Sequence, residues 1–424
     1  MGVGHRLGIL HRIDRRIMKI LLIIYGSIQQ VSGGYLYDRV VISALRERGD
    51  SVDILKLKKY PYLCAPVQSL GPKLRYLFAQ ARSHYDCIVV DELVHPSLPF
   101  LVMGAARKPP FMVTLVHHLK SSERVGPFVR LISRTLEKHL IKNSHMLVVN
   151  SRTTQEVVRL LAKRSIPIVI CRPGKDTLGF KKKTQEQSRS NRTDEHSTTV
   201  HVLMVGNLIR RKGHDFLLRA LVPLRDKDWR LTVVGSDTAD RRYAKSLVSF
   251  IQSSGLGGKV CFVGTVSDET LMQLYQGGDL FVFPSEYEGY GIALAEALSF
   301  GLPYIALDSG ALGEITAAGS AENEKLSLDH ANAPDPPTTT SPDENRIDAE
   351  IDLIRRPGGF LIRGRKGELF SKALEALISD GRLRAEMSQE AHALSRSLPS
   401  WKETGECFYR ALHQTFESHV CGNR

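Results

Sequence analysis

Several features that would assign this chain of 424 residues to a well-marked class are missing. No run approaches the ~20 apolar residues of a membrane-spanning helix, and the aliphatic run at residues 19–25 fits a buried strand. The six cysteines form no Cys-x-x-Cys pair, which argues against a zinc site and a disulfide framework and suits a reducing, cytoplasmic setting. No Gly-x-Gly-x-x-Gly occurs, so a dinucleotide cofactor is not supported.

Acidic residues are scarce in the first part of the chain. Residues 1–172 hold 27 Lys and Arg against 11 Asp and Glu, whereas the remainder holds 31 against 34. Such an excess indicates an anionic partner, which can be a membrane surface, another polyanion or an acidic acceptor. A solvated basic face explains the same numbers. We expect peripheral contact with an anionic membrane through this part, and no nucleic-acid partner.

Short β-rich runs alternate with helical stretches in both parts of the chain, which predicts parallel sheets. The expected strands are residues 19–25, 51–57, 87–90, 111–116, 146–149 and 168–171, then 200–205, 229–234, 259–263, 280–283 and 303–306. Polar stretches at 181–199 and 319–350 lack apolar periodicity, and we expect a linker and a disordered insert there. The sequence therefore predicts an α/β protein with two Rossmann-like domains facing across a cleft. The expected boundaries are 1–172 for the first domain, 173–199 for the linker, 200–398 for the second domain and 399–424 for a C-terminal helix that packs back on the first domain.

Two glutamates, Glu288 and Glu296, flank a glycine-rich turn at residues 289–291. The strand before the turn and the Ala- and Leu-rich helix after it place Glu288 in a loop and Glu296 about two turns later. That helix is apolar nearly all round, so a carboxylate on it needs a buried partner. The N–H groups at its start suit a phosphate. Two carboxylates beside an anion cradle favour a sugar nucleotide as ligand; solvated surface charges are the alternative.

A basic loop follows another predicted strand. After Gly206 and Asn207 come three consecutive cations at residues 210–212, a natural clamp for a diphosphate at a strand's carboxyl end, although a solvated charge run is the alternative. Glycines that allow a ligand to approach the backbone, or that merely form tight turns, follow other strands: Gly33, Gly34, Gly235 and Gly264.

Two histidines, His117 and His118, follow the predicted strand 111–116. The carboxyl end of a strand is where open α/β sheets place ligands. A structural role and a ligand-binding role are both open for the pair.

Taken together, these motifs resemble the family-4 glycosyltransferases, which have the GT-B fold. In the second part the resemblance runs through GNLIRRKG (206–213), VVGSD (233–237), FVGTVSDETL (262–271), DLFVFPSEYEGYGIALAEALSFGLPYIA (279–306) and GALGEI (310–315). In the first part it runs through SGGYLYDR (32–39), VVNSRTTQE (148–156) and RPGKD (172–176). It extends over nearly the whole chain apart from the two polar stretches, and the combination of motifs is specific.

The resemblance implies transfer of a sugar, with retention of the anomeric configuration, from a nucleotide-sugar donor to a glycan, lipid or small-molecule acceptor. It implies no cofactor and no required metal. Lys212, assisted by Arg211, would neutralise the leaving diphosphate, and Glu288 would contact the donor sugar. The other implied site residues are Glu296 at the ribose, the backbone of Gly289, Tyr290 and Gly291 at the phosphates, Gly33 and Gly34 at the donor–acceptor junction, and His117 or His118 by the transferred sugar.

One position departs from the family pattern, because many members carry Arg where this chain has Asn207. Arg210 or Arg211 can supply that charge. Two alternative functions are a GT-B nucleotide-sugar epimerase and a catalytically silent subunit that binds sugar nucleotides. A phosphorylase is disfavoured, because no lysine stands in a recognisable pyridoxal phosphate motif. For a transferase we expect the leaving diphosphate to carry the developing charge, and we expect a front-face route because no carboxylate nucleophile is better placed than Glu288.

Overall fold

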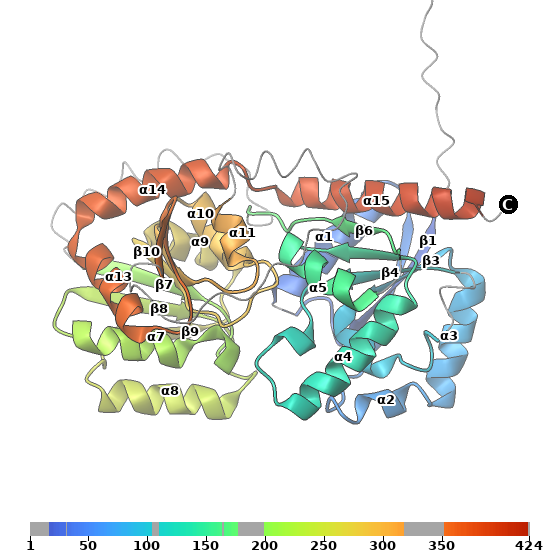
Figure 1. Cartoon of the computed structure of the whole chain (residues 1–424), viewed down its shortest axis with the longest axis horizontal. Helices are drawn as coiled ribbons and strands as arrows, with labels where there is room; N and C mark the ends of the chain where they lie inside the picture. Colours follow the sequence, from blue (N-terminus) through green and yellow to red (C-terminus); the bar gives the residue numbers. More distant parts are fainter. Residues whose placement is uncertain are drawn as a thin grey trace, which may run out of the picture.

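The computed structural model describes residues 17–30, 32–103, 110–162, 165–176, 199–317 and 352–422. Two β-sheets lie side by side in it, each with helices packed on its faces (Figure 1). Most of the predicted linker and all of the predicted insert at 319–350 lie outside the described residues. The α/β class and the two mainly parallel sheets predicted from the sequence are confirmed.

The first sheet is parallel throughout. Its strand order is β2 (Ser51–Leu57), β1 (Lys19–Tyr25), β3 (Cys87–Asp91), β4 (Phe111–Val116), β5 (Met146–Val149) and β6 (Ile168–Ile170). Its central strands are buried apolar runs, as expected for a parallel sheet covered on both faces. The order reverses between β1 and β3, so that a crevice for a ligand is expected at their carboxyl ends.

The second sheet has one antiparallel strand, at its edge. The order is β12 (Leu353–Arg356), β13 (Gly359–Ile362), β11 (Tyr304–Leu307), β10 (Leu280–Phe283), β7 (Val200–Val205), β8 (Trp229–Val234) and β9 (Val260–Gly264). Among the described strands of this sheet, only β12 runs against its neighbour. This order reverses between β7 and β10, which makes their loops the expected ligand site of this half.

Helices connect the strands and cover both sheets. In the first half they are α1 (Gly33–Glu47), α2 (Ala65–Gln68), α3 (Pro72–His84), η1 (Glu92–Ser97), η3 (Lys120–Ser122), α4 (Pro127–Lys142) and α5 (Arg152–Ala162). In the second half they are η4 (Arg210–Lys212), α7 (His214–Leu221), η5 (Val222–Leu224), α8 (Arg241–Ser253), α9 (Asp268–Gly277), α10 (Ile292–Ser299), α11 (Leu312–Thr316), α13 (Gly367–Ser379) and α14 (Gly381–Ser395). Among the described helices, none is long and apolar enough to cross a membrane.

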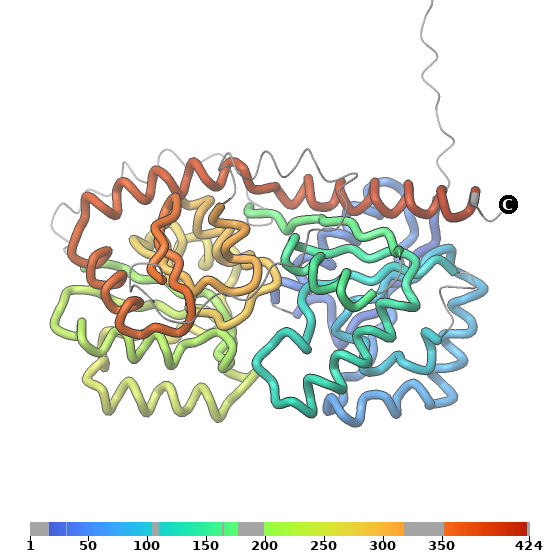
Figure 2. Tube along the Cα trace, viewed as in Figure 1, coloured from blue at the N-terminus to red at the C-terminus, as the bar shows by residue number. Residues whose placement is uncertain are grey.

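The last helix, α15 (Trp401–Gly422), returns to the first half (Figure 2). Its apolar residues Trp401, Phe408 and Leu412 share one core cluster with residues of α1 and β1. The chain crosses between the halves twice, and the two crossings are hydrogen-bonded to each other. The N–H of Lys175 donates to the carbonyl of Pro399 at 2.9 Å, and the N–H of Trp401 donates to the Asp176 carboxylate at 2.7 Å.

Candidate functional site

The loops that follow β1 and β4 of the first sheet meet the loop that follows β10 of the second. A Cβ on Gly289 would lie 1.9 Å from the carbonyl oxygen of His117, so only glycine allows the two backbones to approach this closely. A Cβ on Gly33 would lie 2.9 Å from Cδ1 of Ile292, and one on Gly34 would lie 3.3 Å from the ring of His117. The structure therefore brings together four of the predicted site residues where the two halves touch.

Two loops from the neighbouring strands β7 and β10 form the charged centre of the second half. Gly213 ends η4 with a positive φ of 73°, and a Cβ on it would lie 2.2 Å from the carbonyl oxygen of Pro284. The N–H of Glu286 donates to the carbonyl of Arg211 at 2.8 Å. These contacts hold the basic loop after β7 against the acidic loop after β10.

Lys212, Arg211 and Glu288 form an ion-pair cluster, here called the Lys212 cluster, between these loops. Lys212 Nζ lies 2.6 Å and Arg211 Nη1 3.2 Å from Oε1 of Glu288. Burial by itself would raise the pKa of Glu288, but the charges of Lys212 and Arg211 outweigh burial and lower that pKa to about 2. Burial lowers the pKa of Lys212, and Glu288 opposes that shift. With two cations and one carboxylate, the Lys212 cluster is net positive and suits an anion.

The second glutamate of the motif has a different environment. Glu296 is only 6% exposed on α10, and the Tyr275 hydroxyl donates to its Oε2 at 3.0 Å. The Tyr275 hydroxyl is therefore the buried hydrogen-bond partner that the apolar helix pattern predicted for Glu296. Burial raises the pKa of Glu296 to about 7, although the hydrogen bond from Tyr275 acts in the opposite direction. At neutral pH Glu288 is therefore ionised, whereas Glu296 is partly protonated.

The turn between the two glutamates leads into α10. Gly291 precedes the helix with a positive φ of 110°. The first N–H groups of a helix have no acceptor within the helix, and its positive dipole end adds to their attraction for an anion. The ring of Tyr290 is buried in the core of the second half. Only the backbone of Tyr290 is therefore available to a ligand.

Asn207 has a structural partner in the neighbouring loop. Its Oδ1 accepts the N–H of Ser236 at 3.0 Å. Gly235 packs under the same loop, because a Cβ on it would lie 2.2 Å from the carbonyl oxygen of Gly206, and its N–H donates to Gly264 at 2.9 Å. Asn207, Gly235 and Gly264 thus lie together at the carboxyl ends of β7, β8 and β9, where Asn207 ties two loops to each other.

Three buried carboxylates around His117 were not predicted. Its ring Nε2 lies 3.3 Å from Oδ1 of Asp38, and its backbone N–H donates to Glu92 at 3.0 Å. Asp38, Asp91 and His117 each place one potential ligand atom within 4.8 Å of the others. Burial alone would lower the pKa of His117, but Asp38, Asp91 and Glu92 raise it to about 10. These carboxylates therefore favour the protonated ring of His117.

His118 belongs to a different network, which links the two halves. Its Nε2 lies 2.9 Å from Oε1 of Glu123, and Nε of Arg211 lies 3.7 Å from the same oxygen. Burial would raise the pKa of Glu123, but its bonds to His118 and Lys120 lower that pKa to about 2. A charged Glu123 therefore connects the loop after β4 with the Lys212 cluster.

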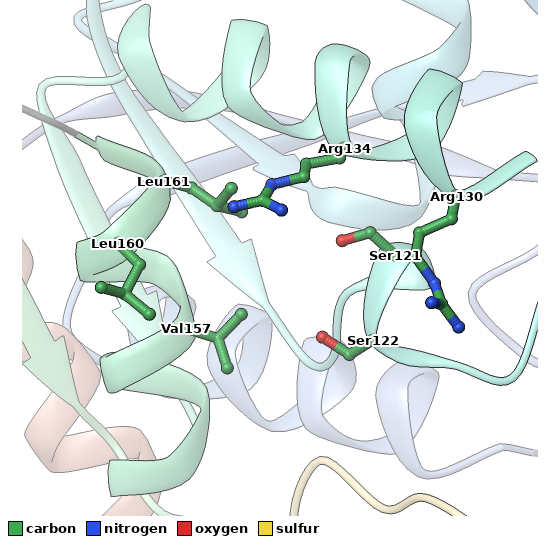
Figure 3. A pocket seen from close by; sticks show the side chains of 7 residues that line it. All are labelled: Ser121, Ser122, Arg130, Arg134, Val157, Leu160 and Leu161. Atoms are coloured by element: carbon green, nitrogen blue, oxygen red, sulfur yellow. The ribbon is translucent and has the colours of Figure 1, made fainter. Parts of the chain in front are cut away.

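An open pocket of about 190 Å³, which was not predicted, lies beside this network on the first half (Figure 3). Side chains of α4 and α5 face each other across it, and the hydroxyls of η3 lie between them. Its lining residues are Ser121, Ser122, Arg130, Arg134, Val157, Leu160 and Leu161. The guanidinium groups of Arg130 and Arg134 suit an anionic group, whereas the Ser121 hydroxyl already donates to the carboxylate of Glu137. The leucines and the valine suit an apolar group.

Comparison with known proteins identifies the architecture. Residues 185–327 match the family model described as glycosyl transferases group 1. The structure superposes on sucrose-phosphate synthase from Thermosynechococcus elongatus with a TM-score of 0.72, at 19% identity, over 95% of this chain and 100% of that one. Anabaena HepE in complex with UDP-glucose superposes with a TM-score of 0.67, at 18% identity, over 94% and 100%. The fold is GT-B.

Curated relatives match shorter stretches of this GT-B chain. D-inositol 3-phosphate glycosyltransferase of Corynebacterium diphtheriae is 27% identical over 188 residues, which is 42% of this chain and 44% of that protein. Mannosylfructose-phosphate synthase of Agrobacterium fabrum is 36% identical over 117 residues, 26% of each chain. The chain thus spans about half the length, or less, of such relatives.

Proposed function

We propose that this protein transfers a sugar from a nucleotide-diphosphate donor to an acceptor, with retention of configuration. The observation that carries the proposal is the net positive Lys212 cluster at the β7–β10 reversal, next to the start of α10. This is the position at which α/β folds bind nucleotides. The glycosyl transferases group 1 match and the UDP-glucose complex of Anabaena HepE, a structure of the same fold, support a nucleotide-sugar donor.

In this proposal each part of the site has one task. Lys212 and Arg211 neutralise the leaving diphosphate. Glu288 orients both cations and accepts hydrogen bonds from hydroxyl groups of the donor sugar. Glu296 holds the ribose. The backbone N–H groups of residues 289–291 bind the phosphates, while Gly33 and Gly34 leave room at the junction where the acceptor meets the donor. The imidazolium of His117 lies at the same junction.

The chemistry proposed is a front-face displacement. The bond between the anomeric carbon and the phosphate oxygen breaks, the acceptor oxygen attacks from the same face, and its proton passes to the departing phosphate. Charge then develops mainly on the diphosphate, where the cations and the helix dipole stabilise it. No metal or cofactor takes part in this scheme. Isolation of a covalent glycosyl-enzyme adduct would overturn it.

For the acceptor we propose an anionic group bound in the pocket of Figure 3. The pocket offers Arg130 and Arg134, and it borders the Glu123 network that reaches the Lys212 cluster. Several similar proteins have phosphorylated compounds in their names. Arg130→Ala or Arg134→Ala should raise KM for a phosphorylated acceptor and leave donor affinity unchanged, whereas Arg225→Ala, a change at an exposed residue of the second half, should alter neither.

Contact with an anionic membrane, on the cytoplasmic side, is also part of the proposal. The helices α2 and α3 lie at the outer end of the first half (Figure 1). Exposed apolar and basic residues lie on these helices and on the segments before them. The apolar ones are Tyr60, Leu63, Val67, Leu70, Tyr76 and Leu77, and the basic ones are Lys58, Lys59, Lys73 and Arg75. Binding to vesicles with anionic lipid should weaken as salt is added. Vesicle binding that changes neither with salt concentration nor with lipid charge would contradict the proposed membrane contact.

The experiment that tests the function is turnover of a panel of nucleotide sugars, with and without candidate acceptors. The wild type should release nucleoside diphosphate from at least one donor, and Glu288→Ala should not, whereas Glu375→Ala, at an exposed ion pair with Lys227, should retain activity. Conversion of the donor into its epimer without diphosphate release would favour the epimerase. Donor binding without any turnover would favour the silent subunit.

A further inference from the structure

Two of the six cysteines meet where α15 joins the first half. Cys171 follows β6, Cys407 lies on α15, and their Sγ atoms are 2.7 Å apart although 236 positions separate them in the sequence. Both are free thiols. A disulfide bond is about 2.05 Å long, so its closure needs a shift of only ~0.7 Å. The spacing of the cysteines in the sequence gives no indication that these two lie side by side.

The two thiols differ in a way that suits stepwise oxidation. Cys171 is fully buried, whereas Cys407 is half-buried and is the more exposed of the two. The hydrogen bond shared with Cys171, and then the charge of Arg410, lower the pKa of Cys407, while that of Cys171 is raised by the same hydrogen bond and by burial. The thiolate is the nucleophile in thiol–disulfide exchange. Cys407 is therefore the thiol that reacts first.

We propose that Cys171 and Cys407 are an oxidisable pair that cross-links α15 to the first half. A small-molecule disulfide such as oxidised glutathione is the oxidant. The Cys407 thiolate attacks one of its sulfur atoms and expels one glutathione thiolate. Cys171 then loses its proton, attacks Sγ of Cys407 and expels the second. Two protein thiols lose two electrons and two protons, and one disulfide is reduced to two thiols.

The bond would fasten the chain next to its two crossings between the halves. The Thr404 hydroxyl donates to the carbonyl of Arg172 at 2.7 Å, one residue from Cys171 and one helical turn from Cys407. The hydrogen bonds of Lys175 and Trp401 lie immediately beyond. Oxidation would therefore fix α15 to the first half beside these two crossings. This inference is independent of the proposed function.

The test is disulfide mapping of the full chain. The protein is incubated with oxidised glutathione until the exposed Cys64, Cys261 or Cys421 carries an adduct, then alkylated, digested without reductant and analysed by mass spectrometry. We expect a linked pair of peptides containing Cys171 and Cys407, two hydrogens lighter than their sum, which dithiothreitol separates. Hydrogen exchange of α15 should slow on oxidation and recover on reduction.

Variants provide the controls. Cys261→Ser, a change at an exposed thiol, should leave the linked pair intact, and Cys407→Ser should abolish it. The wild-type map stands on its own if Cys407→Ser does not fold. Adducts on the exposed cysteines without a Cys171–Cys407 pair would overturn the proposal, as would Cys407 paired with any other cysteine.

Discussion

Replacing Lys212 with alanine should remove most of the transfer activity and leave the protein folded. The side chain places its Nζ 2.6 Å from Glu288, at the point where we propose that the diphosphate departs. Loss of one preorganised group that stabilises developing charge costs about 10²–10³-fold in kcat. Arg211 remains 3.2 Å from the same carboxylate oxygen. We therefore expect a loss within this range rather than complete inactivity.

The same change has a defined effect on stability. Removing one partner of a fully buried ion pair costs about 3–5 kcal/mol. Arg211 still compensates Glu288, so we expect about 1–3 kcal/mol. The lowered pKa of Glu288 contributes stability that is present above about pH 4.5 and is lost as the pH falls towards 2. In Lys212→Ala this contribution should shrink, because the pKa of Glu288 moves back towards its ordinary value.

The assays are diphosphate release for kcat and denaturant unfolding at several pH values for stability. Lys227→Ala is the matched control, since Lys227 belongs to the same half and pairs with Glu375 at the surface. Its effect on stability should stay within about 0.5 kcal/mol, with unchanged kcat. A folded Lys212→Ala protein with wild-type kcat would refute the assignment of Lys212.

Three further predictions follow from the packing and the pKa shifts. Gly289→Ala places a Cβ 1.9 Å from the carbonyl oxygen of His117 and should lower both the melting temperature and turnover, whereas Gly257→Ala, with no heavy atom within 4 Å of the new Cβ, should change neither. The pKa of Glu296 is raised to about 7, so its stabilising contribution is lost as the pH rises from about 4.5 through 7. Unfolding at several pH values should therefore show that Glu296→Gln gains stability relative to wild type across that range. A difference in stability that stays constant with pH would contradict this. Asp38→Asn should lower the pKa of His117 from about 10, as followed by NMR of the ring, and an unchanged titration would count against the buried carboxylates as its cause.

Much of the fold could be predicted because parallel strands are continuous apolar runs. The strands at Lys19–Tyr25 and Val200–Val205 begin and end where the pattern placed them. Several others differ by one residue, such as β9, predicted at 259–263 and found at Val260–Gly264. The antiparallel edge strand β12, Leu353–Arg356, was not predicted. It is short and half polar, and its pairing with β13 depends on a tertiary contact.

Candidate site residues could be predicted where they follow a predicted strand and stand in a recognisable motif. Lys212 and Glu288 were found because both stand in loops at strand ends, and the partner required by Glu296 is Tyr275. The carboxylates around His117 were missed, since Asp38 is 79 positions away in the sequence. A signal was present in Asp91, which directly follows a predicted strand just as His117 does. The roles assigned to these residues stay predictions.

Nucleotide binding tests the central claim most directly, because it requires no knowledge of the acceptor. Titration calorimetry of the wild type with UDP, GDP and ADP should show saturable binding of at least one of them. Lys212→Ala should weaken that binding by at least about tenfold, which corresponds to 1.4 kcal/mol. Failure of all three nucleotides to bind, or equal affinity in wild type and Lys212→Ala, would contradict a donor site built on Lys212, Arg211 and Glu288.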